Sequence, residues 1–173
     1  MSQWTKRAGL VLVLGLMTYP TAAQALNLTW AATPTSTDWE DDLNWLGPSG
    51  QIPDDNTDTA MISGLPTNGM DPRLTVNRTV GALTVRGNGD FYTGNGTTNR
   101  TLIVQNNGGQ SGTILIENAG SVMYVYDAPP IIDVDTDHLT INAGGLLRLT
   151  GGGSPRMQVD GILDLNTGGT ISG

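Results

Sequence analysis

Residues 74–173 alternate apolar and polar side chains in short runs. An apolar side chain at every second position predicts a strand that buries one of its two faces. The runs lie at residues 74–76, 83–85, 102–104, 114–116, 139–141, 147–149 and 162–165. After position 25 the chain shows no long amphipathic helical period. The pattern therefore predicts an all-β fold.

Turns of similar composition separate these runs and repeat as units. The clearest units begin at Asn118, Asn142 and Asn166, and each continues with a small residue and one or two glycines. Glycine, and after it asparagine, tolerates the positive φ that a tight corner requires. Recurrence of one unit at a short spacing is typical of a solenoid. We therefore expect a right-handed parallel β-solenoid. An antiparallel β-sandwich or a barrel is the alternative, because strands about 8–12 residues apart fit it as well.

Residues 26–72 differ in composition from the rest of the chain. They hold three of the four tryptophans and most of the prolines, with short strands expected at 28–30 and 60–62 and one helical turn within 38–43. The end of a solenoid has to be covered, since an open end exposes core and unpaired backbone groups. We therefore expect an N-terminal cap at 26–72 and β-solenoid repeats at 73–173. The repeats are expected to continue beyond Gly173, or else to stack end to end on a partner.

The first 25 residues have the pattern of a secretory signal peptide. Lys6 and Arg7 precede an apolar stretch at 8–19, and Ala23 and Ala25 supply the small residues of a cleavage site. The apolar stretch is shorter than the roughly 20 residues that span a bilayer, so a retained anchor is the weaker interpretation. We expect a chain that is exported by a bacterium, begins at Leu26 after cleavage, and is secreted or held at the cell surface.

Charge and cysteine content narrow the range of partners. Without the signal peptide the chain has six arginines, no lysine and sixteen acidic residues, a net charge of −10. Such a surface repels phosphate backbones and anionic lipids, which argues against nucleic-acid binding and membrane insertion. The chain contains no cysteine. Packing, hydrogen bonds and bound metal ions are the remaining means of stabilising the fold.

The order of several motifs resembles that of a known group of proteins. The motifs are Trp39, Asn44-Trp45, and residues 52–53, 58–62, 79–85 and 139–149. In this order they are similar to the start of exported bacterial surface proteins built from autotransporter-type β-strand repeats. The resemblance implies a β-solenoid that is exported and non-catalytic, a structural or adhesive stalk or passenger region. It carries over no catalytic residue, because the matching positions are structural. The chain differs from that group in having no anchoring segment before Gly173.

Two acidic clusters are candidate calcium sites. Asp133, Asp135 and Asp137 would project from one face of a straight strand, about 7 Å apart. Their repulsion would favour a bound cation, but calcium needs six to eight oxygens and hence ligands from a turn or a neighbouring strand. The second cluster, in a predicted loop, is Asp54, Asp55 and Asp58. The alternative interpretation is a solvated face for the first cluster and a polar turn for the second.

Aromatic residues suggest a second kind of site. Trp39 and Trp45, with Trp30, could form a platform for sugar rings, which would make the chain a carbohydrate-binding module for extracellular polysaccharide. The alternative is that they fill the core of the cap. For Tyr92, Tyr124 and Tyr126 the same two interpretations apply, and Tyr124 and Tyr126 would share one face of a strand.

An enzymatic function is the least favoured interpretation. His138 is the only histidine, and neither a Gly-x-Ser-x-Gly nor a His-Glu-x-x-His motif is present. A β-helix hydrolase could use two of Asp133, Asp135 and Asp137 as acid and base, whereas a lyase would need a base and a cation beside it. Nothing in their spacing singles out that use. The sequence therefore favours a structural protein over a binding module, and a binding module over a polysaccharide lyase or hydrolase.

Overall fold

The computed structural model describes residues 25–94, 100–105, 112–118, 120–126, 134–150 and 155–173. Its elements are β1 (Asn27–Trp30), the 3-10 turn η1 (Asp42–Asn44), β2 (Trp45–Leu46), β3 (Thr59–Ser63), β4 (Arg78–Val80), β5 (Ala82–Arg86), β6 (Asp90–Tyr92), β7 (Leu102–Val104), β8 (Thr113–Ile116), β9 (Val122–Tyr126), β10 (Val134–Ile141), β11 (Leu146–Thr150), β12 (Met157–Leu165) and β13 (Thr170–Ser172). The all-β prediction is confirmed.

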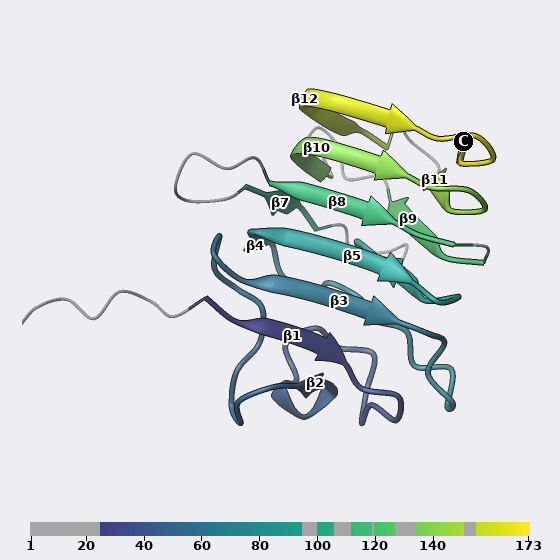
Figure 1. The fold of residues 1–173 in the computed structure, drawn as a ribbon. Coiled ribbons are helices and arrows are strands. Elements are labelled where there is room, and N and C mark those ends of the chain that lie inside the picture. The colour runs from purple at the N-terminus through teal and green to yellow at the C-terminus, as the bar shows by residue number, and fades with distance from the viewer. Residues whose placement is uncertain (1–24, 95–99, 106–111, 119, 127–133, 151–154) are drawn as a thin grey trace, which may run out of the picture.

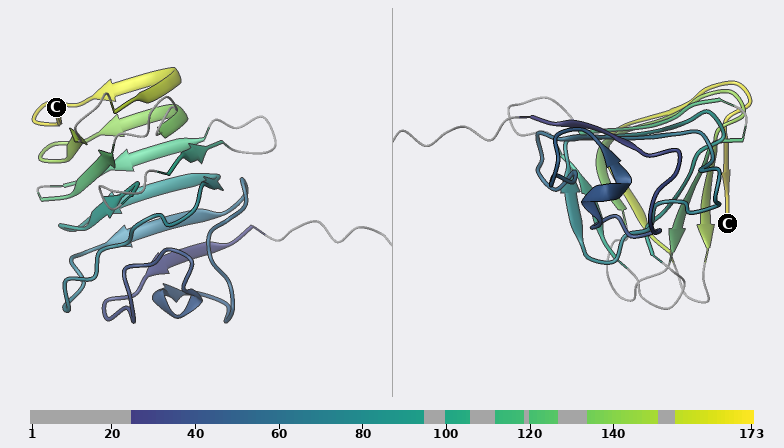
Figure 2. Two further views of the ribbon diagram at one scale, coloured as in Figure 1. Left: turned by 180° about the vertical axis from the view of Figure 1, so that it is seen from behind. Right: turned by 90° about the horizontal axis from the view of Figure 1, so that it is seen from below.

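The strands form two sheets that curl around a shared interior (Figures 1 and 2). The nine-stranded sheet contains β2, β1, β3, β5, β8, β10, β7 and β4, with β12 pairing to β10. The four-stranded sheet has the order β13, β11, β9, β6. Within the described residues every strand pair is parallel except β1–β2, which is antiparallel. The nine-stranded sheet is therefore mixed.

The chain passes repeatedly from the first sheet to the second, and we call each such pass a level. The levels are β5 to β6, β8 to β9, β10 to β11, and β12 to β13. Figure 1 shows them one above another, from teal to yellow, and Figure 2 shows from below that their strands overlie one another. β10 is long enough to pair with two shorter strands, through its first half with β7 and through its second half with β8.

Apolar side chains of successive levels line up in rows inside the molecule. One row is Ala60, Leu83, Ile114, Leu139 and Leu163, and another is Ile62, Val85, Ile116, Ile141 and Leu165. The first four members of each row are at most 1% exposed. The last members, on β12, are 51% and 52% exposed because no later strand covers them in the described chain. The apolar positions of the alternating runs thus form an aliphatic core in which residues of successive strands stack.

The turns at Asn142 and Asn166 are in direct contact, and the turn at Asn118 has a glycine of the same conformation. Asn166 Nδ2 donates to Asn142 Oδ1 at 2.8 Å, and the two residues are 24 positions apart. Gly120, Gly144 and Gly168 hold equivalent places with φ of 85°, 80° and 88°, a conformation that residues with a side chain rarely adopt. These turns connect the two sheets at each level, so the sequence repeat and the structural repeat coincide there.

Two details differ from the sequence-based expectations. Residues 74–76 form no strand; Leu74 is buried, but the pairing next to it consists of two isolated bridges, of Arg73 with Asp38 and with Tyr92. The helical turn begins at Asp42 and ends at Asn44, one residue beyond the expected segment, with Asp41 as its N-cap. The short strands expected at 28–30 and 60–62 lie within β1 and β3, which join the nine-stranded sheet. The segment 26–72 is therefore continuous with that sheet.

Candidate functional site

The tryptophans of residues 26–72 lie in the core. Trp39 is 0% exposed, Trp30 3% and Trp45 6%. Their rings meet edge to face, with centroids 5.1 Å apart for Trp30–Trp45 and 4.6 Å for Trp39–Trp45, and Trp39 also packs on Phe91. Since stacking with a sugar requires an exposed ring face, the glycan-binding prediction for Trp39 and Trp45 is corrected: both rings are core residues of the cap.

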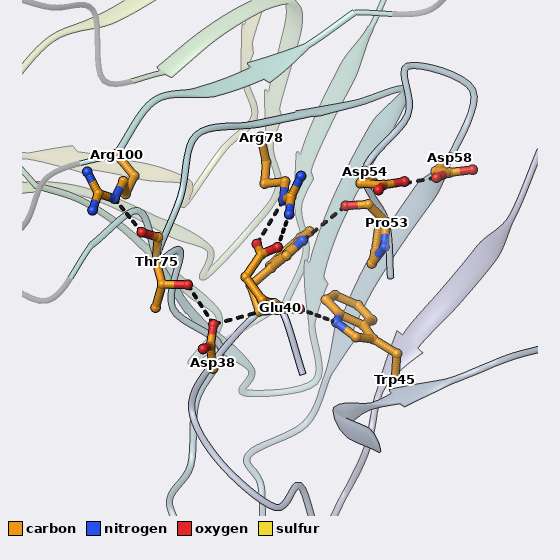
Figure 3. A network of polar contacts seen from close by, with 10 residues as sticks. Asp38, Glu40, Trp45, Pro53, Asp54, Asp58, Thr75, Arg78 and Arg100 are labelled. Atoms are coloured by element: carbon orange, nitrogen blue, oxygen red, sulfur yellow. Dashed lines mark hydrogen bonds and ion pairs between the residues drawn. The ribbon is translucent and has the colours of Figure 1, made fainter. Parts of the chain in front are cut away.

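Each indole N–H of this cluster is used inside the protein. Trp39 donates to the carbonyl of Pro53 at 3.0 Å, Trp45 donates to the carbonyl of Trp39 at 2.8 Å, and Trp30 donates to the carbonyl of Met70 at 3.1 Å. Two of these bonds are drawn in Figure 3. These hydrogen bonds hold the loop segments that contain Trp39, Pro53 and Met70 against the tryptophan cluster.

Polar contacts join the cap to the strands above it (Figure 3). The Arg78 guanidinium at the start of β4 forms an ion pair with the Glu40 carboxylate. The Asp38 carboxylate accepts from the Thr75 hydroxyl at 2.7 Å, and the Thr75 carbonyl accepts from Arg100. These contacts connect residues that are 25 to 38 positions apart in the sequence, so they fix the position of the cap rather than form a pocket.

Asp58 serves the backbone rather than a metal. It is 2% exposed, and its Oδ1 accepts from the Leu26 N–H at 3.0 Å. Its Oδ2 accepts from the N–H groups of Asp54 and Asp55, both at 3.2 Å. Burial, and then the charges of Asp58 and Asp55, raise the pKa of Asp54 above its usual value. The calcium site predicted at Asp54, Asp55 and Asp58 is therefore corrected to a loop closed by one carboxylate.

Asp135 and Asp137 both lie on the partly exposed face of β10, as a strand would place them. The alternation of faces is interrupted only after them, at His138, where the pairing of β10 with β12 has shifted by one residue. Asp137 Oδ2 accepts from the Gly112 N–H at 2.8 Å. Burial, and then Asp160 and Asp137, raise the pKa of Asp135. Asp133 lies outside the described residues, so the predicted site of three aspartates is represented by Asp135 and Asp137.

His138 contacts an aspartate of the neighbouring strand. Its Nε2 lies 3.2 Å from Asp164 Oδ2 on β12. In the part of the chain that the structure describes, no three histidine, cysteine, aspartate or glutamate side chains are grouped as a metal site.

The outer face of the four-stranded sheet carries a cluster that the sequence did not reveal. Tyr92 on β6 and Tyr124 on β9 are register partners, and their rings stack with centroids 4.4 Å apart and an interplanar angle of 2°. The Arg73 guanidinium lies 4.5 Å from the Tyr92 ring centroid, and that of Arg148 lies 5.8 Å from the Tyr124 centroid. Arg73, at an isolated bridge, and Tyr92, Tyr124 and Arg148, on three neighbouring strands of this sheet, thus form one cation–aromatic column.

This column brings together tyrosines that the sequence pattern did not pair. Alternation predicts that Tyr124 and Tyr126 share one face of a strand, whereas the observed stack joins Tyr92 and Tyr124 across two strands; the side chain of Tyr126 is outside the described set. One sequence signal indicates that both tyrosines face outward. Each follows an apolar residue, Phe91 or Met123, that is buried in the structure. The ring faces are covered by each other and by arginine, so they do not form an open sugar platform.

Two carboxyl groups with raised pKa values lie beside this column. Burial, and then the charge of Asp71, raise the pKa of Asp90 to about 6. Burial also raises the pKa of Asp71, against the opposing effect of Arg73, and Asp71 Oδ1 is buried without a hydrogen-bond partner among the described residues. Burial and Asp90 raise the pKa of Tyr92. Burial is thus the first cause of the raised pKa values of all three groups on this face.

The raised pKa of Asp90 predicts a pH dependence of stability. Because the folded state holds the Asp90 proton up to about pH 6, and the unfolded state releases it near pH 3.8, the free energy of unfolding should increase as the pH falls from 7 towards 4. Asp90 is only half-buried, so screening by water limits the effect to about 1 kcal/mol. Thermal melts of the wild type and Asp90→Asn between pH 4.5 and 7.5 measure it. Parallel curves for the two proteins would contradict the assignment.

Comparison of the chain with protein-family models, with curated proteins and with solved structures gives no match. Among the described residues, the structure has no helix that is long and apolar enough to cross a membrane.

Proposed function

We propose that this chain is an exported bacterial structural protein, a right-handed parallel β-solenoid that serves as a stalk or passenger region at the cell surface. The observation that carries the proposal is the register: in both sheets each level lies in parallel on the level before it, with equivalent residues opposite one another. An antiparallel sandwich would instead bring neighbouring strands together in opposite directions.

The aligned rows support a mechanical role. Each level contributes side chains of the same kind at the same place, such as Val85, Ile116 and Ile141 in the interior. At the corner, Asn142 and Asn166 of successive turns are joined by a hydrogen bond. Stiffness then comes from repetition of similar levels rather than from one large core. β1 and β2, which carry Trp30 and Trp45, lie below β3 (Figure 1), and the buried tryptophans fill the core at this end of the stack. A closed end and equal levels are the parts that a stalk requires.

The residues that an enzyme would need are engaged in structural contacts. Asp137 binds the backbone of Gly112, and His138 pairs with Asp164 across two strands. These contacts favour a non-catalytic role over the lyase and hydrolase alternatives. Of the partners considered, an extracellular polysaccharide or another surface component would meet the outward faces of the sheets, because the tryptophans are buried.

A polysaccharide panel tests the proposed function. The purified chain from Leu26 to Gly173 is applied to neutral and acidic polysaccharides with and without calcium, and both retention and newly formed reducing ends or unsaturated uronates are measured. A structural stalk releases no product under either condition. Product formation would overturn the proposal and direct attention to Asp135 and His138. Retention that is lost in Tyr124→Ala but not in Leu46→Ala would instead establish a binding module on the four-stranded sheet.

A further inference from the structure

Both backbone polar groups of Leu26 form hydrogen bonds within the fold. The Leu26 N–H donates to Asp58 Oδ1 at 3.0 Å, and the Leu26 carbonyl accepts from the Thr59 N–H at 2.7 Å. The Leu26 side chain packs against the core, whereas Ala25 before it is exposed. Leu26 is also the residue that follows the small-x-small pattern ending at Ala25. The predicted cleavage point therefore coincides with the point at which the chain enters the fold.

The acceptor of this bond is a buried carboxylate. Asp58 is 2% exposed, and the hydrogen bonds that the structure gives its two oxygens all come from backbone N–H groups, of Leu26, Asp54 and Asp55. These donors compensate part of the cost of burying the negative charge, and a cation in place of one of them would compensate more of it. The charged groups around it are Asp54 and Asp55, which add negative charge.

We propose that cleavage between Ala25 and Leu26 creates such a cation, so that the new α-ammonium group of Leu26 forms a buried ion pair with Asp58. Hydrolysis of the peptide bond leaves the carboxylate on Ala25 and the amine, protonated, on Leu26. The nitrogen is already within hydrogen-bonding distance of Asp58, so no rearrangement of β1 or of the loop is required. Removal of the signal peptide would thereby stabilise the folded state of the cap through this ion pair. The inference rests on the export part of the proposed function.

The ion pair between Leu26 and Asp58 adds stability over a defined pH range. An α-amino group ordinarily titrates at about 8, and a neighbouring carboxylate raises that value in the folded state. The stability that the ion pair adds is therefore fully present below about pH 8 and is lost as the pH rises through the higher folded value. This range is separate from that of Asp90, whose contribution changes between about pH 4 and 7.

Selective acetylation tests the ion pair, because the chain from Leu26 onward contains no lysine and its α-amino group is its one primary amine. The protein is prepared with Leu26 as its first residue, and half is acetylated. Acetylation should lower the melting temperature at pH 7 by about 5 °C and have little effect at about pH 10.5, where the amine is neutral. In Asp58→Asn, acetylation should change nothing at either pH. A form that begins at Ala25 should melt like the acetylated protein.

An unchanged melting temperature after acetylation at pH 7 would overturn the ion pair. If Asp58→Asn does not fold, the comparison of acetylated, Ala25-initiated and Leu26-initiated chains at the two pH values still decides the question. Mass spectrometry of chain exported from a bacterium tests the cleavage point separately: a first residue other than Leu26 would overturn the proposal. Failure of export alone would remove the proposed cellular role but leave the acetylation result to stand on its own.

Discussion

Replacing Trp39 by alanine is expected to lower the free energy of unfolding by about 4 kcal/mol, the cost of removing a large buried aromatic side chain. The indole is 0% exposed, contacts the rings of Trp45 and Phe91, and donates to the Pro53 carbonyl. Its removal leaves a cavity and a carbonyl without its donor. Urea unfolding followed by tryptophan fluorescence and by circular dichroism measures the loss.

The neighbouring Leu46 provides the control. It is 59% exposed, so Leu46→Ala should change the free energy of unfolding by less than about 0.5 kcal/mol. Trp39→Phe should fall between the two variants, because it keeps a ring but not the indole donor. If Trp39→Ala proved as stable as Leu46→Ala, the aromatic cluster would not be the core of the cap.

Deleting residues 118–141 is expected to leave a shorter protein that still unfolds in one cooperative transition. The deletion joins Glu117 to Asn142, which holds the place of Asn118, and removes β9 and β10. β11 can then pair with β6 where β9 lay, and β12 can pair with β7 and β8 where β10 lay. The urea dependence of unfolding should decrease roughly in proportion to the residues removed.

The matched control removes half as much chain. A deletion of residues 118–129 takes away β9 but leaves β10 without a connection that spans a level, so the later strands cannot stack in register. The control should lose β structure and cooperativity although it lacks fewer residues. If both deletions unfolded the protein, the levels would not be interchangeable units, and the β-solenoid proposal would fail.

The repeated part of the fold was predictable because its signals are local. The units at Asn118, Asn142 and Asn166 share a glycine that requires positive φ, and alternation assigns residues such as Leu139 and Ile141 to the interior. The predicted runs from residue 83 onward all lie in strands. The run at 74–76 does not, because alternation marks Leu74 for burial but contains no information about whether a neighbouring backbone is available to pair.

The candidate sites were harder to predict because they depend on partners that are distant in sequence. Trp39 fits a platform and a core equally well until the loop carrying Pro53 is placed beside it. Asp135 and Asp137 share a face as alternation predicts, but the contact of Asp137 with the Gly112 N–H depends on a segment 25 residues away. Tyr92 and Tyr124 lie farther apart than Asn142 and Asn166, so no fixed period matches them; parallel pairing alone brings them together.

The pairing order also bears on how the molecule is built. From β7 onward, each strand pairs with at least one strand that precedes it in the sequence, whereas β4 and β6 find their strand partners later, in β7 and β9. A chain that emerges from its N-terminus therefore meets an already formed neighbour for each of these later strands. Growth in the direction of synthesis or translocation then needs no later segment to arrive before they can pair.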